Sequence, residues 1–428
     1  MAVTTDATAG RRASPGPAER SRAYAVLLVV AIVAVSLNLR PAAVSVGPVL
    51  TEIRDGLGIS PLVAGVLTTL PVVAFAVLGL GAPRAARVLG LHRTMLLSLV
   101  LTTLGLVGRS LVSGQVAFLV LSLLALSGAA AANILVPSLV KVHFPDRIGT
   151  LTAVYSTALA IGLTAASVAT VPLGENLAGV LGDESAGGWR TALGSWAILA
   201  AVAAMPWLGL VRREVVPREE GSAISVADAA RTSLGRRMAL FFALQSFQAY
   251  SVFGWFAEVY RDAGFSAGEA GLLLGVITGL GIPVSFIVPS VAARLDDQRL
   301  LIVGIMACGP VAYLGLTFAP TTVPYAWAVL TGVSLAAFPL ILVLIGMRAR
   351  TSEGTAALSG FTQSAGYAMA ALGPFAVGAM RDASGGWTLP LLVMTVLLVP
   401  QLIIGLTVAK PEFIEDELPS ADGRAASR

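Results

Sequence analysis

Apolar stretches of 18 or more residues recur along the chain from Ala23 to Val408, and this pattern constrains the fold more than any other feature. Each stretch is long enough to cross a hydrocarbon core about 30 Å thick as an α-helix. Only 12% of the residues are charged, whereas soluble domains carry about 25%. A membrane β-barrel would need shorter segments with alternating polarity, and these are absent from the sequence. The sequence therefore predicts an all-α membrane protein whose helices satisfy their own backbone hydrogen bonds.

Polar and Pro/Gly-rich breaks divide the chain into twelve predicted transmembrane helices. The predicted spans are 23–49, 62–82, 94–112, 116–140, 149–173, 190–211, 238–260, 268–290, 300–318, 325–347, 355–380 and 387–409. If both termini are cytoplasmic, the inner segments carry 22 of the 28 Lys and Arg residues and the outer segments carry five. This asymmetry of positive charge predicts that both termini are cytoplasmic. It also accounts for the basic composition without a nucleic-acid partner.

The predicted spans form two groups of six, separated by the longest internal loop. We expect the following organisation: a disordered cytoplasmic tail (1–22), an N-terminal bundle (23–211), a cytoplasmic linker (212–237), a C-terminal bundle (238–409) and a cytoplasmic tail (410–428). Within the linker, the segment from Ser222 to Leu234 is predicted to form a short surface helix.

An internal repeat relates the two groups. At a shift of 206 residues, the window from Ser45 to Arg93 is identical to its counterpart at 12 of 49 positions, including Glu52 with Glu258. A composition this biased would give about four identities by chance. The repeat predicts two pseudo-symmetric six-helix bundles that rock around a site between them. The alternative is that the halves are alike only because they share a membrane composition.

Arg40 is the most informative single residue, because it lies about halfway through the first predicted span. A guanidinium at this depth costs about 2.5 to 3.5 kcal/mol, so it should face a polar cavity or a partner rather than lipid. Pro41 and Pro48 follow it and should break the helix. A permanently charged fork of donors favours a solute with negative charge or strong acceptor oxygens. The alternative is a structural arginine that donates to the carbonyls of a neighbouring helix.

Uncharged polar side chains within the spans are the other candidates for a substrate cavity. Their helical spacing would gather several of them on one wall. With Arg40, the candidate substrate-binding residues are Asn133, Tyr155, Gln245, Gln363 and Tyr367. For each of these, the competing interpretation is an interhelical hydrogen bond worth about 0.6 kcal/mol.

The remaining ionisable residues suggest no chemistry. Lys141, Arg348 and Arg109 lie near span ends and are interpreted as interfacial anchors. Glu258 is interpreted as a solvated interface residue, so no residue is assigned to ion coupling. With one cysteine, two histidines and no nucleotide-binding motif, we expect no metal, no cofactor and no catalytic residue, and the chain is not expected to be an enzyme.

Several motifs, taken together, carry a family resemblance. They are Asn38-Leu39-Arg40-Pro41, Leu67-Thr68-Thr69-Leu70-Pro71, Asn133-Ile134-Leu135-Val136-Pro137, Phe144-Pro145, Leu151-Thr152-Ala153-Val154-Tyr155-Ser156, Leu358-Ser359-Gly360, Gln363-Ser364, Gly366-Tyr367, Gly373-Pro374 and Gly386-Trp387. In these the chain resembles the major facilitator superfamily, and within it the cyanate permease and 2-nitroimidazole transporter (CynX/NimT) subfamily. The resemblance implies the twelve-helix major facilitator fold, alternating access, and cyanate-like or nitroimidazole-like solutes.

Two departures from the family pattern bear on mechanism. The loop after the second span has Arg87 where the superfamily usually has an Asp, and Ala257-Glu258 stands where related sequences more often have Pro.

The predicted function is secondary active transport of a small anionic or nitro-bearing organic solute by a monomer in the inner (plasma) membrane, with Arg40 as the main contact. The alternatives are a multidrug or metabolite exporter of the same fold, or a transport-inactive sensor or scaffold.

Overall fold

The computed structural model describes residues 17–78, 81–213, 224–292, 294–295 and 297–418. These residues form helices joined by short turns, and no strand occurs among them, which confirms the predicted all-α class. Below, the N-terminal half means the described residues up to Arg213, and the C-terminal half means those from Ile224 onward.

The N-terminal half contains nine α-helices and several single turns. Its elements are α1 (Pro17–Asn38), α2 (Pro41–Val44), η1 (Gly47–Val49), α3 (Leu50–Leu57), α4 (Pro61–Val73), the π-helical turn η2 (Ala74–Leu78), α5 (Ala82–Leu89), α6 (Leu91–Leu111), α7 (Gln115–His143), η4 (Pro145–Arg147), α8 (Ile148–Leu181), η5 (Ala186–Gly188), α9 (Trp189–Leu210) and η6 (Val211–Arg213).

The C-terminal half begins with a short helix and continues with long ones. Its elements are α10 (Val226–Arg231), α11 (Ser233–Asp262), α12 (Ala267–Gly279), α13 (Gly281–Ala292), α14 (Arg299–Phe318), α15 (Pro324–Ser334), α16 (Ala337–Met347), α17 (Ser352–Ala370), α18 (Leu372–Ser384), α19 (Thr388–Val408) and η7 (Ile414–Glu417).

Nine helical segments of the described chain are long and apolar enough to cross a membrane, and each coincides with a predicted span. The other three predicted spans are also helical. They are α4 with η2, α11, and α17 with α18. The α4 segment is shorter, and α11 carries more polar residues than the nine. A total of twelve spans and the cytoplasmic position of the termini remain predictions.

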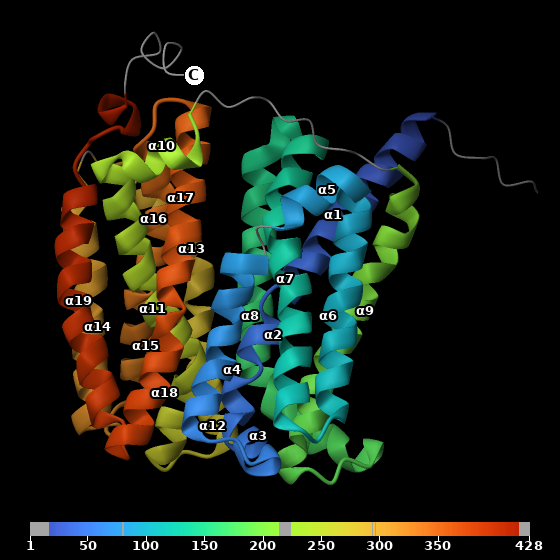
Figure 1. The fold of residues 1–428 in the computed structure, drawn as a ribbon, viewed down its shortest axis with the longest axis vertical. Coiled ribbons are helices and arrows are strands. Elements are labelled where there is room, and N and C mark those ends of the chain that lie inside the picture. The colour runs from blue at the N-terminus through green and yellow to red at the C-terminus, as the bar shows by residue number, and fades with distance from the viewer. Residues whose placement is uncertain (1–16, 79–80, 214–223, 293, 296, 419–428) are drawn as a thin grey trace, which may run out of the picture.

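The predicted tails and linker lie partly outside the described residues, namely 1–16, 214–223 and 419–428. The described parts of the tails and the linker contain helical segments. Helix α1 begins at Pro17, inside the predicted disordered tail, and α10 occupies the predicted surface helix of the linker. The start of α1, α10 and η7 all lie at the same end of the bundle (Figure 1). We call the opposite end the outer end, because the charge pattern predicts that it faces outward.

The internal repeat also relates two turns, each of which has a glycine with positive φ followed by a helix-capping serine. Gly58 and Gly264, 206 residues apart, both adopt positive φ (64° and 102°), a conformation that favours glycine. Two residues later, Ser60 and Ser266 cap the next helices, with their hydroxyls accepting from Val63 and Glu269 backbone N–H groups. The same turn is therefore built twice, as the 206-residue shift predicts.

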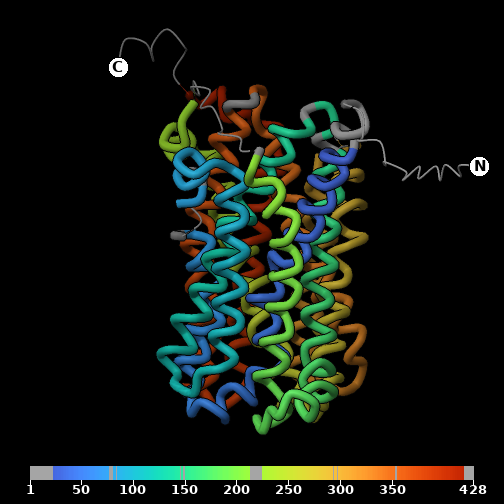
Figure 2. The backbone as a smooth tube through the Cα atoms, turned by 90° about the vertical axis from the view of Figure 1, so that its right-hand side faces the viewer, coloured from blue at the N-terminus to red at the C-terminus, as the bar shows by residue number. Residues whose placement is uncertain are grey.

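The two halves stand side by side (Figure 1), and the helices of both run roughly parallel (Figures 1 and 2). They meet where α8 packs against α12 and where α4 packs against α18. At the second contact, a Cβ on Gly378 would lie 3.0 Å from the Cα of Gly65 and 2.7 Å from the Trp255 ring. Only a glycine allows this approach, so the halves are in close backbone contact there.

Candidate functional site: a cavity between the halves

The first transmembrane segment breaks at Arg40, as its prolines predict. Helix α1 ends at Asn38, and α2 begins with Pro41 as its first residue and Arg40 as its N-cap. Proline is favoured at this position because its missing N–H would have no partner there. Pro48 lies in the next single turn, η1. The break lies at the seam between the halves, where Arg40 meets residues of the C-terminal half.

A small cavity lies beside Arg40, with a volume of about 20 Å³, which is room for about one water molecule. Both halves contribute to its wall. The N-terminal half provides Arg40, Ala43, Val44, Val46, Gly47, Thr68 and Pro71, and the C-terminal half provides Tyr250, Phe253 and Gly254. The cavity is therefore at the seam about which two bundles of this kind would move.

The Arg40 guanidinium is surrounded by aromatic side chains. It donates a hydrogen bond to the Tyr250 hydroxyl at 3.1 Å and lies 5.1 Å from the centre of the Phe75 ring. Tyr367 packs against both Phe75 and Tyr250, with ring centres 6.1 Å apart in each case. Among the ion pairs of the described residues, none includes Arg40. The site thus presents a cation that has no carboxylate partner in the described part of the chain.

The seam is closed at the outer end by two ion pairs between the halves. Arg54 binds Glu258, and Arg261 binds both oxygens of Glu52 at 2.6 and 2.8 Å. Glu52 and Glu258 are the repeat-related glutamates, so each half contributes one acid and one base. The four side chains are between 3% and 23% exposed, which makes the pairs less subject to solvent screening than surface pairs.

Of the sequence-predicted site residues, the structure brings Arg40 and Tyr367 together. Gln363 lies one turn before Tyr367 in α17 and donates to the Ser359 hydroxyl at 2.8 Å. Asn133 is half-buried in α7, and Tyr155 is half-buried in α8 near Thr152 and Ser156. Neither Asn133 nor Tyr155 lines the small cavity. Their predicted role stays a prediction.

Gln245 occupies a different environment from the one expected. It is 1% exposed, donates to the Leu335 carbonyl at 3.2 Å and accepts from Gln401 at 2.7 Å. These partners all belong to the C-terminal half. In this conformation Gln245 makes the interhelical hydrogen bonds that were its competing interpretation.

Three charged residues differ from their sequence interpretation. Arg109 and Arg348, expected to be interfacial anchors, are 0% and 2% exposed, and Glu258, expected to be solvated, is 3% exposed. Arg348 donates to the carbonyls of Val408 and Ala409 and to Gln298. Such partners lower the cost of burying a charge, and sequence position alone does not disclose them. Lys141 is exposed, as an anchor should be.

Sequence reasoning missed Tyr250, Phe75 and Thr68 as neighbours of Arg40. Tyr250 carried a usable signal, since it is a polar aromatic side chain inside a predicted span, as the candidates Tyr155 and Tyr367 are. Phe75 lies in a π-helical turn, a feature that is frequent at functional sites but has no sequence signature.

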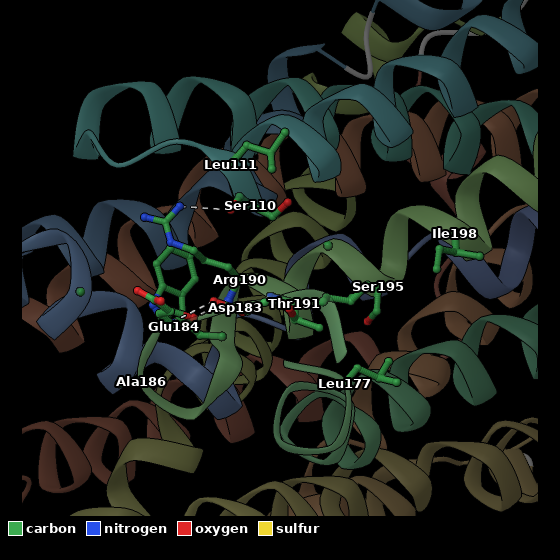
Figure 3. A pocket seen from close by; sticks show the side chains of 16 residues that line it. Ser110, Leu111, Leu177, Asp183, Glu184, Ala186, Arg190, Thr191, Ser195 and Ile198 are labelled. Atoms are coloured by element: carbon green, nitrogen blue, oxygen red, sulfur yellow. Dashed lines mark hydrogen bonds between the residues drawn. The ribbon is translucent and has the colours of Figure 1, made fainter. Parts of the chain in front are cut away.

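A second, larger cavity of about 830 Å³ opens at the outer end, and its lining residues all belong to the N-terminal half (Figure 3). Its polar groups bind one another: Arg190 donates to the Ser110 and Val112 carbonyls. Burial opposes ionisation of Asp183, but backbone N–H donors from Ser185 and Thr191 outweigh it and lower the pKa of the carboxyl. Because it lies away from the seam, we do not place the transport site there.

Comparison with solved structures shows the fold. The chain superimposes on a bacterial homolog of the human lysosomal transporter Spinster, in an inward-facing and occupied conformation, with a TM-score of 0.76 at 16% identity, covering 95% of this chain and 100% of that one. It superimposes on a D-xylose-proton symporter with a TM-score of 0.66 at 14% identity, covering 94% and 99%.

Comparison with sequences shows the family. The transporter YycB of Bacillus subtilis is 33% identical over 88% of this chain and 91% of its own length. Two Escherichia coli proteins, the 2-nitroimidazole transporter and the cyanate transport protein CynX, are 29% and 28% identical over 91% and 90% of this chain, and over 97% and 98% of their own lengths. The model of the Major Facilitator Superfamily matches residues 25–374. The chain is therefore a multi-pass membrane transporter that belongs to the Major Facilitator Superfamily.

Proposed function

We propose that this protein is a secondary active transporter of a small anionic or nitro-bearing organic solute, cyanate-like or nitroimidazole-like. It works as a monomer in the inner (plasma) membrane by alternating access. The observation that carries the proposal is the Arg40 guanidinium, which faces a cavity between the halves and has no ion-pair partner in the described residues. A partly buried cation at membrane depth without a counter-charge is costly, and an anion or a nitro group would offset that cost.

Alternating access is supported by where the halves hold together. Helices α3 and α11 are joined by the Arg54–Glu258 and Glu52–Arg261 pairs at the outer end. The two pairs are arranged pseudo-symmetrically, which suits a gate. If the halves part there, all four charged groups are exposed to water and regain their hydration. The conformation described is then one with the outer gate closed.

The names of two relatives support the proposed class of solute. These relatives are named for cyanate and for 2-nitroimidazole, and both solutes are small and carry strong acceptor atoms. Phe75, Tyr250 and Tyr367 around Arg40 would suit a planar solute, since aromatic faces pack against flat groups.

The test is uptake by purified protein in vesicles. A panel of cyanate, nitrate, small carboxylates and nitroimidazoles is offered with and without a pH gradient. The wild-type protein should move at least one anion or nitro compound, Arg40→Gln should abolish uptake, and Arg40→Lys should retain part of it. Uptake by Arg40→Gln at the normal rate would contradict the proposal. No uptake of any solute by folded wild-type protein would favour the sensor or scaffold, and uptake of bulky neutral compounds alone would favour the exporter.

A further inference from the structure

Arg109 is a second guanidinium close to the same cavity wall and, unlike the partly buried Arg40, it is fully buried. It comes from α6, is 0% exposed, and donates to the Ala42 carbonyl at 2.9 Å and to the Ser45 hydroxyl at 3.2 Å. Ala42 and Ser45 belong to the broken segment of the first span, whose neighbouring residues Ala43 and Val44 line the cavity with Arg40. Arg109 therefore contacts this segment without lining the cavity itself.

The hydrogen bonds of Arg109 do not neutralise it. Both acceptors are uncharged, and its Nε is buried without a hydrogen-bond partner. No ion pair found in the described residues includes Arg109, and the one buried carboxylate among them, Glu258, binds Arg54. Arg348, the other arginine buried among the described residues, also has uncharged partners, but its Nε donates to the Val408 carbonyl, whereas the Arg109 Nε has no partner and Arg109 binds the segment that lines the cavity.

The cavity thus has two positively charged side chains near it: Arg40 lines it, and Arg109 binds Ala42 and Ser45, which flank the lining residues Ala43 and Val44. At an effective dielectric constant of about 20, a unit charge within about 12 Å of a bound monovalent anion changes the affinity for that anion by about tenfold or more. The two positive charges act in the same direction on an anion and leave a neutral solute almost unaffected.

We propose that Arg109 is a positioning and selectivity residue, which fixes the broken segment that carries Arg40 and supplies a second positive charge that makes the site selective for anions. The inference rests on the proposed function and specifies its solute class: an anion is preferred to a neutral nitro compound. Arg109 does not touch the solute, since the Pro41–Val44 segment separates it from the cavity.

Ser45 allows the charge of Arg109 to be cancelled while its hydrogen bond is kept. In Ser45→Asp, a carboxylate would face the Arg109 guanidinium and pair with it, whereas Ser45→Asn is matched in size and uncharged. Because the new carboxylate itself repels an anion, the Ser45 pair measures the combined charge of positions 45 and 109, and the Arg109 pair described below separates a charge effect from support of the fold. If the charge of Arg109 attracts the solute, Ser45→Asp should bind anions at least tenfold more weakly than Ser45→Asn.

The experiment measures the apparent affinity of full-length variants in vesicles for the panel anion that the wild type takes up fastest, with cyanate tried first. Uncharged 1-methyl-2-nitroimidazole is the competing probe, and its apparent affinity should change less than threefold. Arg109→Gln and Arg109→Lys form a second pair, in which the lysine variant should bind the anion about tenfold more tightly. Equal anion affinities within either pair would overturn the inference, whereas wild-type protein that takes up no anion would overturn the anionic part of the proposed function itself.

Discussion

The Tyr250 hydroxyl accepts a hydrogen bond from the Arg40 guanidinium at 3.1 Å, and this contact joins the two halves of the bundle beside the central cavity. Because the oxygen accepts from Arg40, the hydroxyl can also donate its own proton, either to a solute or to the neighbouring Tyr367 hydroxyl. The pair can therefore offer an anion one charged and one neutral donor at a single point.

Replacement of Tyr250 by Phe should weaken solute binding without unfolding the protein. A hydrogen bond to a charged group is worth about 1.5 to 3 kcal/mol, so the apparent KM for a transported anion should rise about tenfold or more. The measurement is uptake at varied solute concentration. Tyr260→Phe is the control on the same helix, because the Tyr260 hydroxyl is buried without a hydrogen-bond partner and its removal should leave KM unchanged. A Tyr250→Phe variant with normal KM would remove Tyr250 from the site.

Loss of the Arg54–Glu258 pair should open the outer end. Glu258→Gln leaves the partly buried Arg54 without a counter-charge, a change that typically costs 3 to 5 kcal/mol in a buried pair. A cysteine placed at Ala43 in a Cys308→Ser background should then react more than tenfold faster with a membrane-impermeant maleimide added outside. Glu269→Gln is the control, since Glu269 is an exposed acid near the same end. Unchanged labelling of the Glu258→Gln protein would show that this pair does not hold the gate.

Arg348 should contribute to stability rather than to transport. Its guanidinium holds the end of α19 through the Val408 and Ala409 carbonyls at 3.0 and 2.6 Å. Arg348→Met leaves these buried carbonyls and Gln298 without their donor, which should lower the free energy of unfolding by about 3 kcal/mol. Arg299→Met, which removes a partly exposed arginine from a 3.6 Å pair, should cost less than about 1 kcal/mol. Thermal unfolding in detergent compares the two, and equal losses would refute the assignment.

The helices could be predicted well from the sequence, because a backbone in lipid must satisfy its own hydrogen bonds and a helix does so within one segment. Span length and the prolines after Arg40 are local signals, and the structure has helices over the predicted spans and a break before Pro41. The start of α1 at Pro17 was missed, since a helix that extends beyond the hydrocarbon core needs no apolar residues there.

The partners of charged side chains could not be predicted in the same way. Whether Arg109 is an anchor or a buried cation depends on the Ala42 carbonyl, which lies 67 residues away and is exposed to it only because α2 is short. Glu258 is buried because Arg54 of the other half meets it, and the repeat relates Glu258 to Glu52 rather than to its partner. The helical spacing of Gln245 is compatible with a cavity wall. In the structure, however, Gln245 accepts a hydrogen bond from Gln401 and belongs to the packing of the C-terminal half.

The docking of η7 should depend on pH. Partial burial opposes ionisation of Glu415, but the backbone N–H groups of Arg350 and Thr351 donate to its carboxylate and hold its pKa below the usual value. A lowered pKa in the folded state means that this stabilisation is present above the usual pKa and is lost as the pH falls through the lowered value. Hydrogen exchange at Arg350 and Thr351, corrected for the intrinsic rate, should therefore lose protection in acid. Glu415→Gln should show low protection at all pH values, and full protection in that variant would contradict the assignment.

Gly47→Ala tests whether transport requires the halves to close around the cavity. A Cβ at Gly47 would lie 2.6 Å from the Phe253 carbonyl oxygen, which is a backbone atom of the other half and cannot rotate away. The methyl group can be accommodated only if η1 and α11 move apart, and this would strain the Arg54–Glu258 pair, which joins the adjacent helix α3 to α11. The variant should fold, because each half keeps its own packing, but uptake should fall more than tenfold and maleimide labelling from outside should increase. Gly304→Ala is the matched control, since no heavy atom lies within 4 Å of a Cβ there. Normal uptake by Gly47→Ala would mean that the close approach of the halves at this point is not part of the transport cycle.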